Sequence, residues 1–353
     1  MSNNNITEKA VMAALSTVIE PELHRDLVSL NMVRNVKIAG NDLSFTIMLT
    51  TPACPLKSKM EADSRAALAQ VNGLGKITIN WDSNVPTDAR IGSQIGQNFR
   101  NTIAVSSGKG GVGKSTIAVN LAISLAQLGA KVGLLDADIL GPNIPMMMGV
   151  DVMPPARAQK MVPAENFGVK FISMAFLVKP DQPLIWRGPM LHSAIRQLLT
   201  DVHWGELDYL IVDLPPGTGD AQLTLAQVLP LTGALVITQP MQVAASDAIR
   251  GLKTFEKLDV PILGVIENMS GEFFGTGAGE ALAKTYNTEY LGTIPMEANV
   301  RIGGDSGEPI VVAYPDSPAA KALTRIAQAV AARVSVITLA TQSANFIPIE
   351  MVG

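Results

Sequence analysis

The chain has 353 residues, of which 47% are hydrophobic and 16% are charged, so a disordered or fibrous protein is excluded. A formal net charge of −4 gives no overall attraction to nucleic acid or to an anionic membrane, and we expect neither as a partner. The single cysteine, Cys54, excludes an intrachain disulfide and a zinc site that needs two or more cysteines of one chain. We find no secretory signal and no long uncharged apolar run, so the sequence predicts a cytoplasmic protein without a transmembrane helix.

Residues 1–82 predict a small α+β domain. In DLSFTIMLT, residues 42–50, apolar and polar residues alternate, which is typical of a half-buried strand. Ser58 and Glu61 have the spacing of a capping box at the start of a helix. The expected elements in chain order are a helix within 6–20, strands over 32–38 and 42–50, a helix from about 58 and a strand over 77–81.

The rest of the chain predicts a linker, a large domain and a tail. Residues 83–100 are polar and lack periodicity, which indicates a linker. From 101 to 340, apolar runs such as YLIVDL and GALVIT alternate with helical patterns. This order predicts an α/β domain with a mostly parallel sheet flanked by helices. Residues 341–353 are interpreted as a C-terminal tail, too short and uncharged for a membrane-binding helix.

The glycine-rich run SSGKGGVGKST follows a predicted strand and precedes a predicted helix. Residues 108–115 satisfy the P-loop pattern G-x-x-x-x-G-K-[ST] in that setting. We expect Lys114 to bind the β- and γ-phosphates of ATP and the Ser115 hydroxyl to bind Mg²⁺. A glycine-rich turn without a ligand is the structural alternative. The residues predicted to wrap the phosphates are Gly108, Gly110, Gly111, Val112, Gly113, Lys114, Ser115 and Thr116.

A second lysine, Lys109, lies inside the same loop. Because Lys114 already supplies the lysine of the P-loop pattern, we predict that Lys109 reaches across a homodimer to the nucleotide of the partner subunit. It would then act as a catalytic residue together with Lys114. The alternative is a solvated loop charge.

Three aspartates follow apolar strands, whose carboxyl ends face the ligand crevice in α/β sheets. Asp213 ends the run YLIVD and is the candidate for holding Mg²⁺. Asp138 is the candidate that orients the attacking water, with Asp136 supporting the metal. The alternative is that Asp136 and Asp138 only cap the next helix. Gly217, after two prolines, is expected to offer its N–H to the γ-phosphate, unless PPGTG is simply a rigid turn.

The motifs GKGGVGKST, DADILGPN and VDLPPGTGDAQLT together resemble the deviant-Walker-A ATPases, and among them the Mrp/ApbC group of iron–sulfur cluster carriers. IENMS at 266–270, GDSGEPIVV at 304–312 and the N-terminal EPEL and TTPACPL are also similar to that group. The resemblance implies a MinD-like P-loop domain, a nucleotide-sandwich homodimer and slow, Mg²⁺-dependent ATP hydrolysis. It also implies that Lys109 is the signature lysine and that Asn268 contacts adenine.

The sequence departs from the group where the cargo would bind. Members that carry clusters usually have a C-x-x-C pair shortly after ENMS, and here the stretch reads MSGEFFGTGAGEAL. Cys54 is therefore the remaining candidate for an iron or iron–sulfur ligand. Its place just before a predicted helix can lower a thiol pKa and favour the thiolate. The alternative is an apolar loop residue.

Three functional hypotheses follow. The first is a homodimeric ATPase that carries iron–sulfur clusters and transfers them to apoprotein clients or exchanges them with other assembly proteins. The second is an ATP-gated scaffold for cluster assembly that holds no cluster itself, which the missing cysteine pair favours. The third is a positioning ATPase of the ParA or MinD type, which lacks support from a basic stripe or a basic amphipathic helix.

Overall fold

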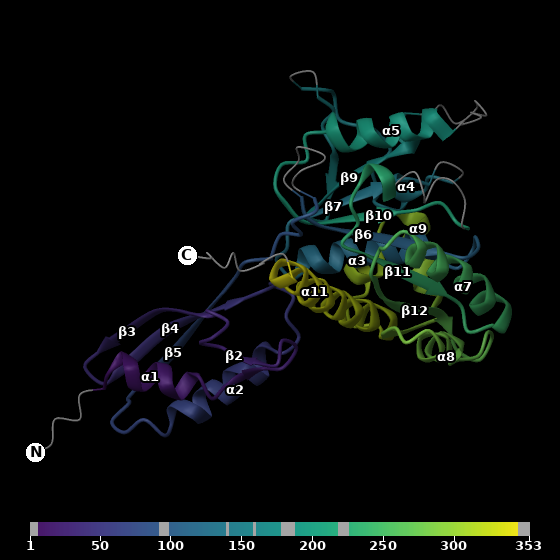
Figure 1. Cartoon of the computed structure of the whole chain (residues 1–353). Coiled ribbons are helices and arrows are strands. Elements are labelled where there is room, and N and C mark those ends of the chain that lie inside the picture. Colours follow the sequence, from purple (N-terminus) through teal and green to yellow (C-terminus); the bar gives the residue numbers. More distant parts are fainter. Residues whose placement is uncertain are drawn as a thin grey trace, which may run out of the picture. The chain divides into compact units, whose positions relative to one another are not determined.

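The computed structural model describes residues 6–91, 99–138, 141–157, 160–177, 188–217 and 226–344, and the chain forms two compact units, 1–86 and 87–353 (Figure 1). The sequence predicts a linker over 83–100, but residues 87–91 pack with the second unit. There the buried carboxylate of Asp88 accepts hydrogen bonds from Arg90, with an Nη2–Oδ2 distance of 2.6 Å, and the Asp88 N–H donates to the Arg100 carbonyl.

The first unit is a three-stranded sheet with two helices. Strand β4 lies in the middle of the sheet, antiparallel to β3 and parallel to β5. A short antiparallel pair, β1 with β2, was not expected from the sequence. The elements are α1 (Glu8–Leu15), β1 (Ile19–Glu20), β2 (Arg25–Asp26), β3 (Val33–Ala39), β4 (Asp42–Leu49), α2 (Lys57–Leu68) and β5 (Ile77–Ser83).

The alternation of β4 builds the core of this unit. Leu43, Phe45, Ile47 and Leu49 are all buried, whereas the residues between them are partly exposed. The predicted capping box of Ser58 and Glu61 is wrong, because α2 begins at Lys57 and its N-cap residue, Leu56, makes no side-chain hydrogen bond. Glu61 instead pairs with Arg65 one turn later, at 2.8 Å.

The second unit is an open sheet of eight strands in the order β13-β12-β11-β6-β10-β7-β9-β8, flanked by helices (Figure 1). All neighbouring strands are parallel except β8 and β9, which confirms the predicted mostly parallel sheet. Its strands are β6 (Phe99–Ser107), β7 (Val132–Asp136), β8 (Ala164–Asn166), β9 (Val169–Ser173), β10 (Leu207–Asp213), β11 (Gly233–Thr238), β12 (Ile262–Ser270) and β13 (Tyr290–Pro295). Its helices are α3 (Lys114–Gln127), α4 (Ile144–Met147), the 3₁₀ turn η1 (Met174–Phe176), α5 (Gly188–Thr200), α7 (Gln242–Lys257), α8 (Ala278–Thr285), α9 (Ala298–Ser306), α10 (Ile310–Ala313) and α11 (Pro318–Ala344).

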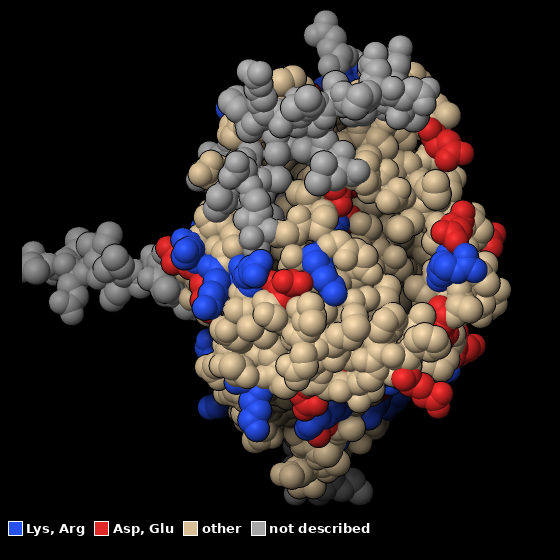
Figure 2. Space-filling view, turned by 90° about the vertical axis from the view of Figure 1, so that its right-hand side faces the viewer, with Lys and Arg blue, Asp and Glu red and all other residues tan. Residues whose placement is uncertain are grey.

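The sheet topology determines where a ligand binds. β6 lies between β10 and β11, and the chain leaves it first toward β7 on one side and later toward β11, β12 and β13 on the other. A crevice opens at the carboxyl end of a strand where the strand order reverses in this way. The loop from β6 to α3 is therefore at the expected binding position. On the side of the unit where α7 lies, a short row of basic and acidic side chains crosses an otherwise uncharged centre, and further charged side chains lie along the edges (Figure 2).

Helix α11 is longer than expected and extends into the predicted tail. Thr341 still donates a side-chain hydrogen bond to the Ile337 carbonyl, and Gln342 donates to the Thr87 carbonyl at 2.8 Å. By length and composition residues 318–342 could cross a membrane, but 56% of the relevant window is buried inside the protein. The helix packs on α3 and β13, as a core helix does. Residues 345–353 lie outside the described part of the chain.

Candidate nucleotide-binding site

The loop between β6 and α3 is shaped to wrap an anion. Gly111 and Gly113 have φ angles of +79° and +84°, which residues with a Cβ rarely adopt. A Cβ on Gly108 would lie 2.1 Å from the carbonyl oxygen of Asp247 in α7, so only glycine fits there. The loop leads into the N-terminus of α3, where unpaired N–H groups and the helix dipole favour a phosphate.

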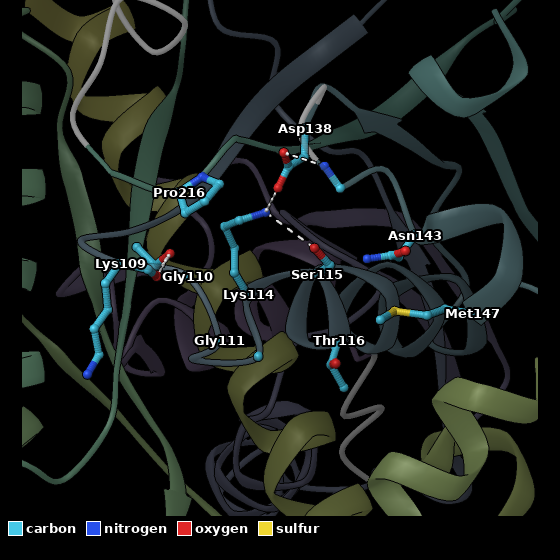
Figure 3. A pocket seen from close by; sticks show the side chains of 13 residues that line it. Lys109, Gly110, Gly111, Lys114, Ser115, Thr116, Asp138, Asn143, Met147 and Pro216 are labelled. Atoms are coloured by element: carbon cyan, nitrogen blue, oxygen red, sulfur yellow. Dashed lines mark hydrogen bonds and ion pairs between the residues drawn. The ribbon is translucent and has the colours of Figure 1, made fainter. Parts of the chain in front are cut away.

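A cavity of about 390 Å³ opens over this loop (Figure 3). It brings together most of the residues that the P-loop pattern singled out, with Asp138 from the segment that follows β7. Val112 is buried in the loop and does not line the cavity. The lining residues are Ser107, Lys109, Gly110, Gly111, Gly113, Lys114, Ser115, Thr116, Asp138, Gly141, Asn143, Met147 and Pro216.

Lys114 is the buried cation of the site. Only 6% of its side chain is exposed, and its Nζ lies 2.6 Å from Asp213 Oδ1 and 3.6 Å from Asp138 Oδ2. The Ser115 hydroxyl donates to Asp213 Oδ2 at 2.5 Å. Figure 3 shows the ammonium directed toward Asp138 and Ser115. Phosphate oxygens and a divalent cation are the groups that would compete for these same donors and acceptors.

Asp136 lies beneath the cavity and does not line it. Its carboxylate accepts hydrogen bonds from the Ser173 hydroxyl at 2.7 Å, the Asp138 N–H at 3.1 Å and the Ile144 N–H at 3.4 Å. Burial, together with the nearby charge of Asp213, raises the pKa of Asp136 to about 7. Burial also raises the pKa of Asp213, although Lys114 opposes the shift. The contacts of Asp136 hold the turn that presents Asp138.

A second cavity of about 290 Å³ adjoins the first, and both share Gly113, Thr116 and Met147 in their linings. The Nδ2 of Asn268 donates to the Val112 carbonyl at 2.8 Å, and a Cβ on Gly113 would come within 2.3 Å of that nitrogen. Its walls are mainly apolar and include the Asn268 amide, with the charged residues Glu297, Arg301 and Asp305 also in the lining. We call it the base cavity, because walls of this kind suit the flat heteroaromatic base that the sequence predicts beside Asn268. The other lining residues are Met269, Pro295, Met296, Glu297, Val300, Arg301, Gly304 and Asp305.

The structure places the remaining predicted residues as follows. The N–H of Gly217 donates to the Ser107 carbonyl at 3.0 Å, so this bond must break before it can meet a γ-phosphate. The side chain of Lys109 points away from Lys114, and no described carboxylate lies within ion-pair distance of it (Figure 3). The Mg²⁺ roles of Ser115, Asp136 and Asp213 remain predictions.

Cys54 lies in the first unit and packs against its hydrophobic core. The pKa of this thiol is raised to about 11, mainly by burial and further by the charges of Glu22 and Glu20. The expected lowering is therefore wrong, because burial outweighs the backbone N–H groups of Leu56 and Lys57 at the start of the helix. Among the described residues, no group of three or more His, Cys, Asp or Glu side chains could hold a metal ion.

Sequence reasoning missed three residues around the site. Met147 and Met296 form walls of the base cavity, and nothing in their spacing marks them. Glu267 is 1% exposed and precedes Asn268 at the end of β12. A charged residue inside the apolar run ILGVIENMS was the available signal, since buried carboxylates need partners.

An open parallel sheet with a glycine-rich loop at its central strand, a buried lysine and strand-end aspartates defines a P-loop NTPase. The chain belongs to the family described as NUBPL iron-transfer P-loop NTPase, which matches residues 98–331. A second family, described as iron–sulfur cluster assembly protein, matches residues 8–81 in the first unit.

Individual relatives agree with the family. The iron–sulfur cluster carrier protein of Synechocystis sp. is 49% identical over 352 residues, covering 95% of this chain and 99% of the relative. The nucleotide-binding protein of Archaeoglobus fulgidus, solved with ADP, has 35% identity and a TM-score of 0.54 over 63% of this chain and 92% of that one. MinD of Pyrococcus horikoshii with Mg-ADP has 25% identity and a TM-score of 0.52, covering 64% and 94%.

Proposed function

We propose that this protein is an ATP-dependent carrier or assembly factor for iron–sulfur clusters, acting in the cytoplasm as a homodimer on apoprotein clients. The observation that supports it best is the pairing, on one chain, of an iron-transfer NTPase unit with an iron–sulfur assembly unit. The Synechocystis carrier is similar over nearly its whole length, which gives the same order of units.

ATP would occupy both cavities, with its base beside Asn268 and its phosphates over the P-loop. Lys114 would leave Asp213 for the β- and γ-phosphate oxygens, and the Ser115 hydroxyl would turn to Mg²⁺. Asp213 would then hold the hydrated ion, which keeps several waters in such sites. Asp138, at the cavity wall, would orient the water that attacks the γ-phosphate.

Lys109 supplies the argument for a dimer. Lys109 lines the cavity of its own chain, but its side chain points away from Lys114 (Figure 3). Directed at the nucleotide of a second copy, its ammonium would offset charge that develops in the transition state. Hydrolysis would remove that attraction and reopen the dimer. Cargo would then be released at the slow rate of ATP hydrolysis.

An iron–sulfur cluster needs more thiolate ligands than one chain contains. One thiol per chain gives two per dimer, whereas a [4Fe–4S] cluster takes four thiolates or substitutes. The raised pKa of Cys54 also keeps it protonated near neutral pH. These two observations favour the second candidate function, an ATP-gated scaffold that recruits a cluster-bearing partner.

Anaerobic reconstitution with iron and sulfide separates the two functions. Iron and acid-labile sulfide per dimer are measured in wild type, in Cys54→Ser and in the matched control Ser58→Ala. A cluster in wild type and control that is lost in Cys54→Ser supports the carrier with Cys54 as ligand. Wild type without iron, but with intact ATP hydrolysis, supports the scaffold. Absence of both cluster and ATPase activity contradicts the proposed function.

A further inference from the structure

The loop at 271–277 is a closed turn that carries a solvent-exposed aromatic side chain, Phe273. The N–H of Gly271 donates to the Gly275 carbonyl at 3.0 Å, and the N–H of Gly275 donates back to the Gly271 carbonyl at 2.8 Å. Phe273 is 89% exposed, and its ring lies 6.2 Å from that of Phe274. The closed turn therefore fixes the backbone that carries Phe273, and its ring lies in solvent.

The far end of this loop is held by Glu267. The buried carboxylate accepts hydrogen bonds from the Gly277 N–H at 3.0 Å and from the Gly279 N–H at 2.7 Å. These are the first N–H groups of α8, which have no partners within the helix and lie at the positive end of its dipole. A Cβ on Gly279 would lie 2.9 Å from the Cβ of Glu267, so the approach depends on glycine.

The near end of the loop is joined to the base cavity. Asn268 and Met269 are adjacent in β12, yet both line that cavity, although neighbours in a regular strand face opposite ways. Met269 has a φ of +61°, and the register of β12 with β13 shifts between Glu267 and Ser270. A bulge with a strained residue is a segment that can take a second arrangement.

Two hydrogen bonds connect this bulge to the walls around it. Asn268 holds the Val112 carbonyl of the P-loop, and the Ser270 carbonyl accepts from the N–H of Met296 at 2.9 Å. Met296 is itself a wall of the base cavity. Residues 267–270 therefore touch the base cavity and P-loop on one side and the 271–277 loop on the other.

We propose that residues 267–270 couple nucleotide occupancy to the 271–277 loop, with Glu267 as the positioning residue. A base that contacts Asn268 and Met269 holds the bulge in one conformation. The Glu267 carboxylate is then held in place, and so are its hydrogen bonds to Gly277 and Gly279. The loop is then held with Phe273 presented when nucleotide is bound and loosens when it leaves. This inference rests on the proposed nucleotide site.

Hydrogen exchange on the full chain, with and without saturating Mg-ADP, tests the coupling. In wild type we expect ADP to slow exchange of the amides at 271–279 by about tenfold. In Glu267→Gln one N–H partner is lost, and the ADP-dependent ratio should fall below about twofold. Glu280→Gln, an equal change of charge on the exposed face of α8, should behave as wild type. ADP affinity, from a fluorescence titration on the same samples, should stay within about threefold.

The outcomes are distinct. A residue that merely stabilises the loop would speed exchange equally with and without ADP, so an unchanged ratio in Glu267→Gln overturns the coupling. Wild type that binds ADP without slowed exchange at 271–279 overturns it as well. Wild type that binds no ADP overturns the proposed function and the coupling with it. Glu267→Asp shortens the side chain and keeps its charge, so ADP should slow exchange at 271–279 less than about twofold in this variant too. It replaces Glu267→Gln in the test if that variant does not fold.

Discussion

Each unit of the chain contains a cluster of buried or partly buried acids, and the two clusters are built in opposite ways. In the NTPase unit, Asp138 and Asp213 lie around the ammonium of Lys114, with the nearer carboxylate 2.6 Å away. In the first unit, Glu20 and Glu22 lie near Cys54, and no described cation forms an ion pair with either. Burial with the charge of Glu20 raises the pKa of Glu22 to about 7.

The difference shows what each cluster is suited to hold. A buried lysine paired with carboxylates can exchange these partners for phosphate, and the carboxylates can then bind a divalent cation. Around Cys54, partial burial and then the charges of Glu22 and Glu20 raise the pKa of the thiol, so it keeps its proton at neutral pH. The NTPase unit already holds the charged groups that its ligand needs. In the first unit, a partner must supply positive charge before Cys54 can act as a thiolate.

Removing the cation should break the first cluster and have the largest effect. In Lys114→Ala the buried Asp213 loses its partner, and the phosphates lose their lysine. We expect ATP affinity to fall at least about a hundredfold, and stability to fall by about 3 kcal/mol. Equilibrium titration with a fluorescent ATP analogue and urea unfolding measure these. Lys131→Ala, an exposed lysine of the same unit, is the control, and unaltered affinity in Lys114→Ala would refute the P-loop assignment.

Asp138→Asn leaves the lysine and removes the carboxylate that lines the P-loop cavity in the described part of the chain. We expect binding within a few-fold of wild type and hydrolysis reduced about a hundredfold, because a positioned carboxylate contributes about 10²–10⁴-fold. Single-turnover hydrolysis and ATP binding are measured on the same preparation. Asp259→Asn, at an exposed turn, is the control. Wild-type turnover in Asp138→Asn would transfer the water-orienting role to another residue.

Lys109→Ala sharpens the comparison, since this lysine lies in the loop but outside the buried network. Binding to the monomer should be nearly unchanged, while ATP hydrolysis should fall at least about tenfold and ATP-dependent dimerisation should be lost. Sedimentation velocity with a slowly hydrolysed ATP analogue reports dimerisation, with Lys253→Ala as the control. Unchanged hydrolysis would mean that Lys109 does not act across the dimer.

Glu22→Gln tests the uncompensated cluster and should have the smallest effect. The folded-state pKa of Glu22 is about 7, above the ordinary 4.5, so its contribution to stability is complete below pH 4.5 and is lost as pH rises through 7. Glutamine does not titrate, so the variant should gain about 1 kcal/mol over wild type at pH 8, after allowance for solvent screening. Exchange of the β4 amides at pH 4.5 and pH 8 measures the gain, and an equal difference at both values would contradict it.

Local patterns predicted the elements that carry the site. The alternation of 42–50 and the strand–loop–helix context of 108–115 follow from side-chain period and glycine chemistry, which are properties of short segments. They located β4, α3 and the P-loop within a few residues.

What the sequence could not predict depends on contacts between distant segments. The turn of Asp136 toward Ser173, and not into the cavity, requires the position of β9 beside β7. The bond from the Gly217 N–H to Ser107 and the burial that raises the pKa of Cys54 arise from packing in the same way. Ser58 matched a capping box, but the N-cap of α2 is Leu56, two residues earlier, and its side chain makes no capping hydrogen bond.

In the proposed site, the wall that the two cavities share would make ATP bind at two joined points, as a chelating ligand does. Gly113, Thr116 and Met147 line both compartments, so a base and a phosphate chain joined in one molecule each raise the effective concentration of the other. Orthophosphate has no base, so it would engage only the P-loop compartment and would lack that advantage. After hydrolysis, orthophosphate should therefore leave before ADP, which its base still holds. The division of the site into two compartments would thus set the order of product release.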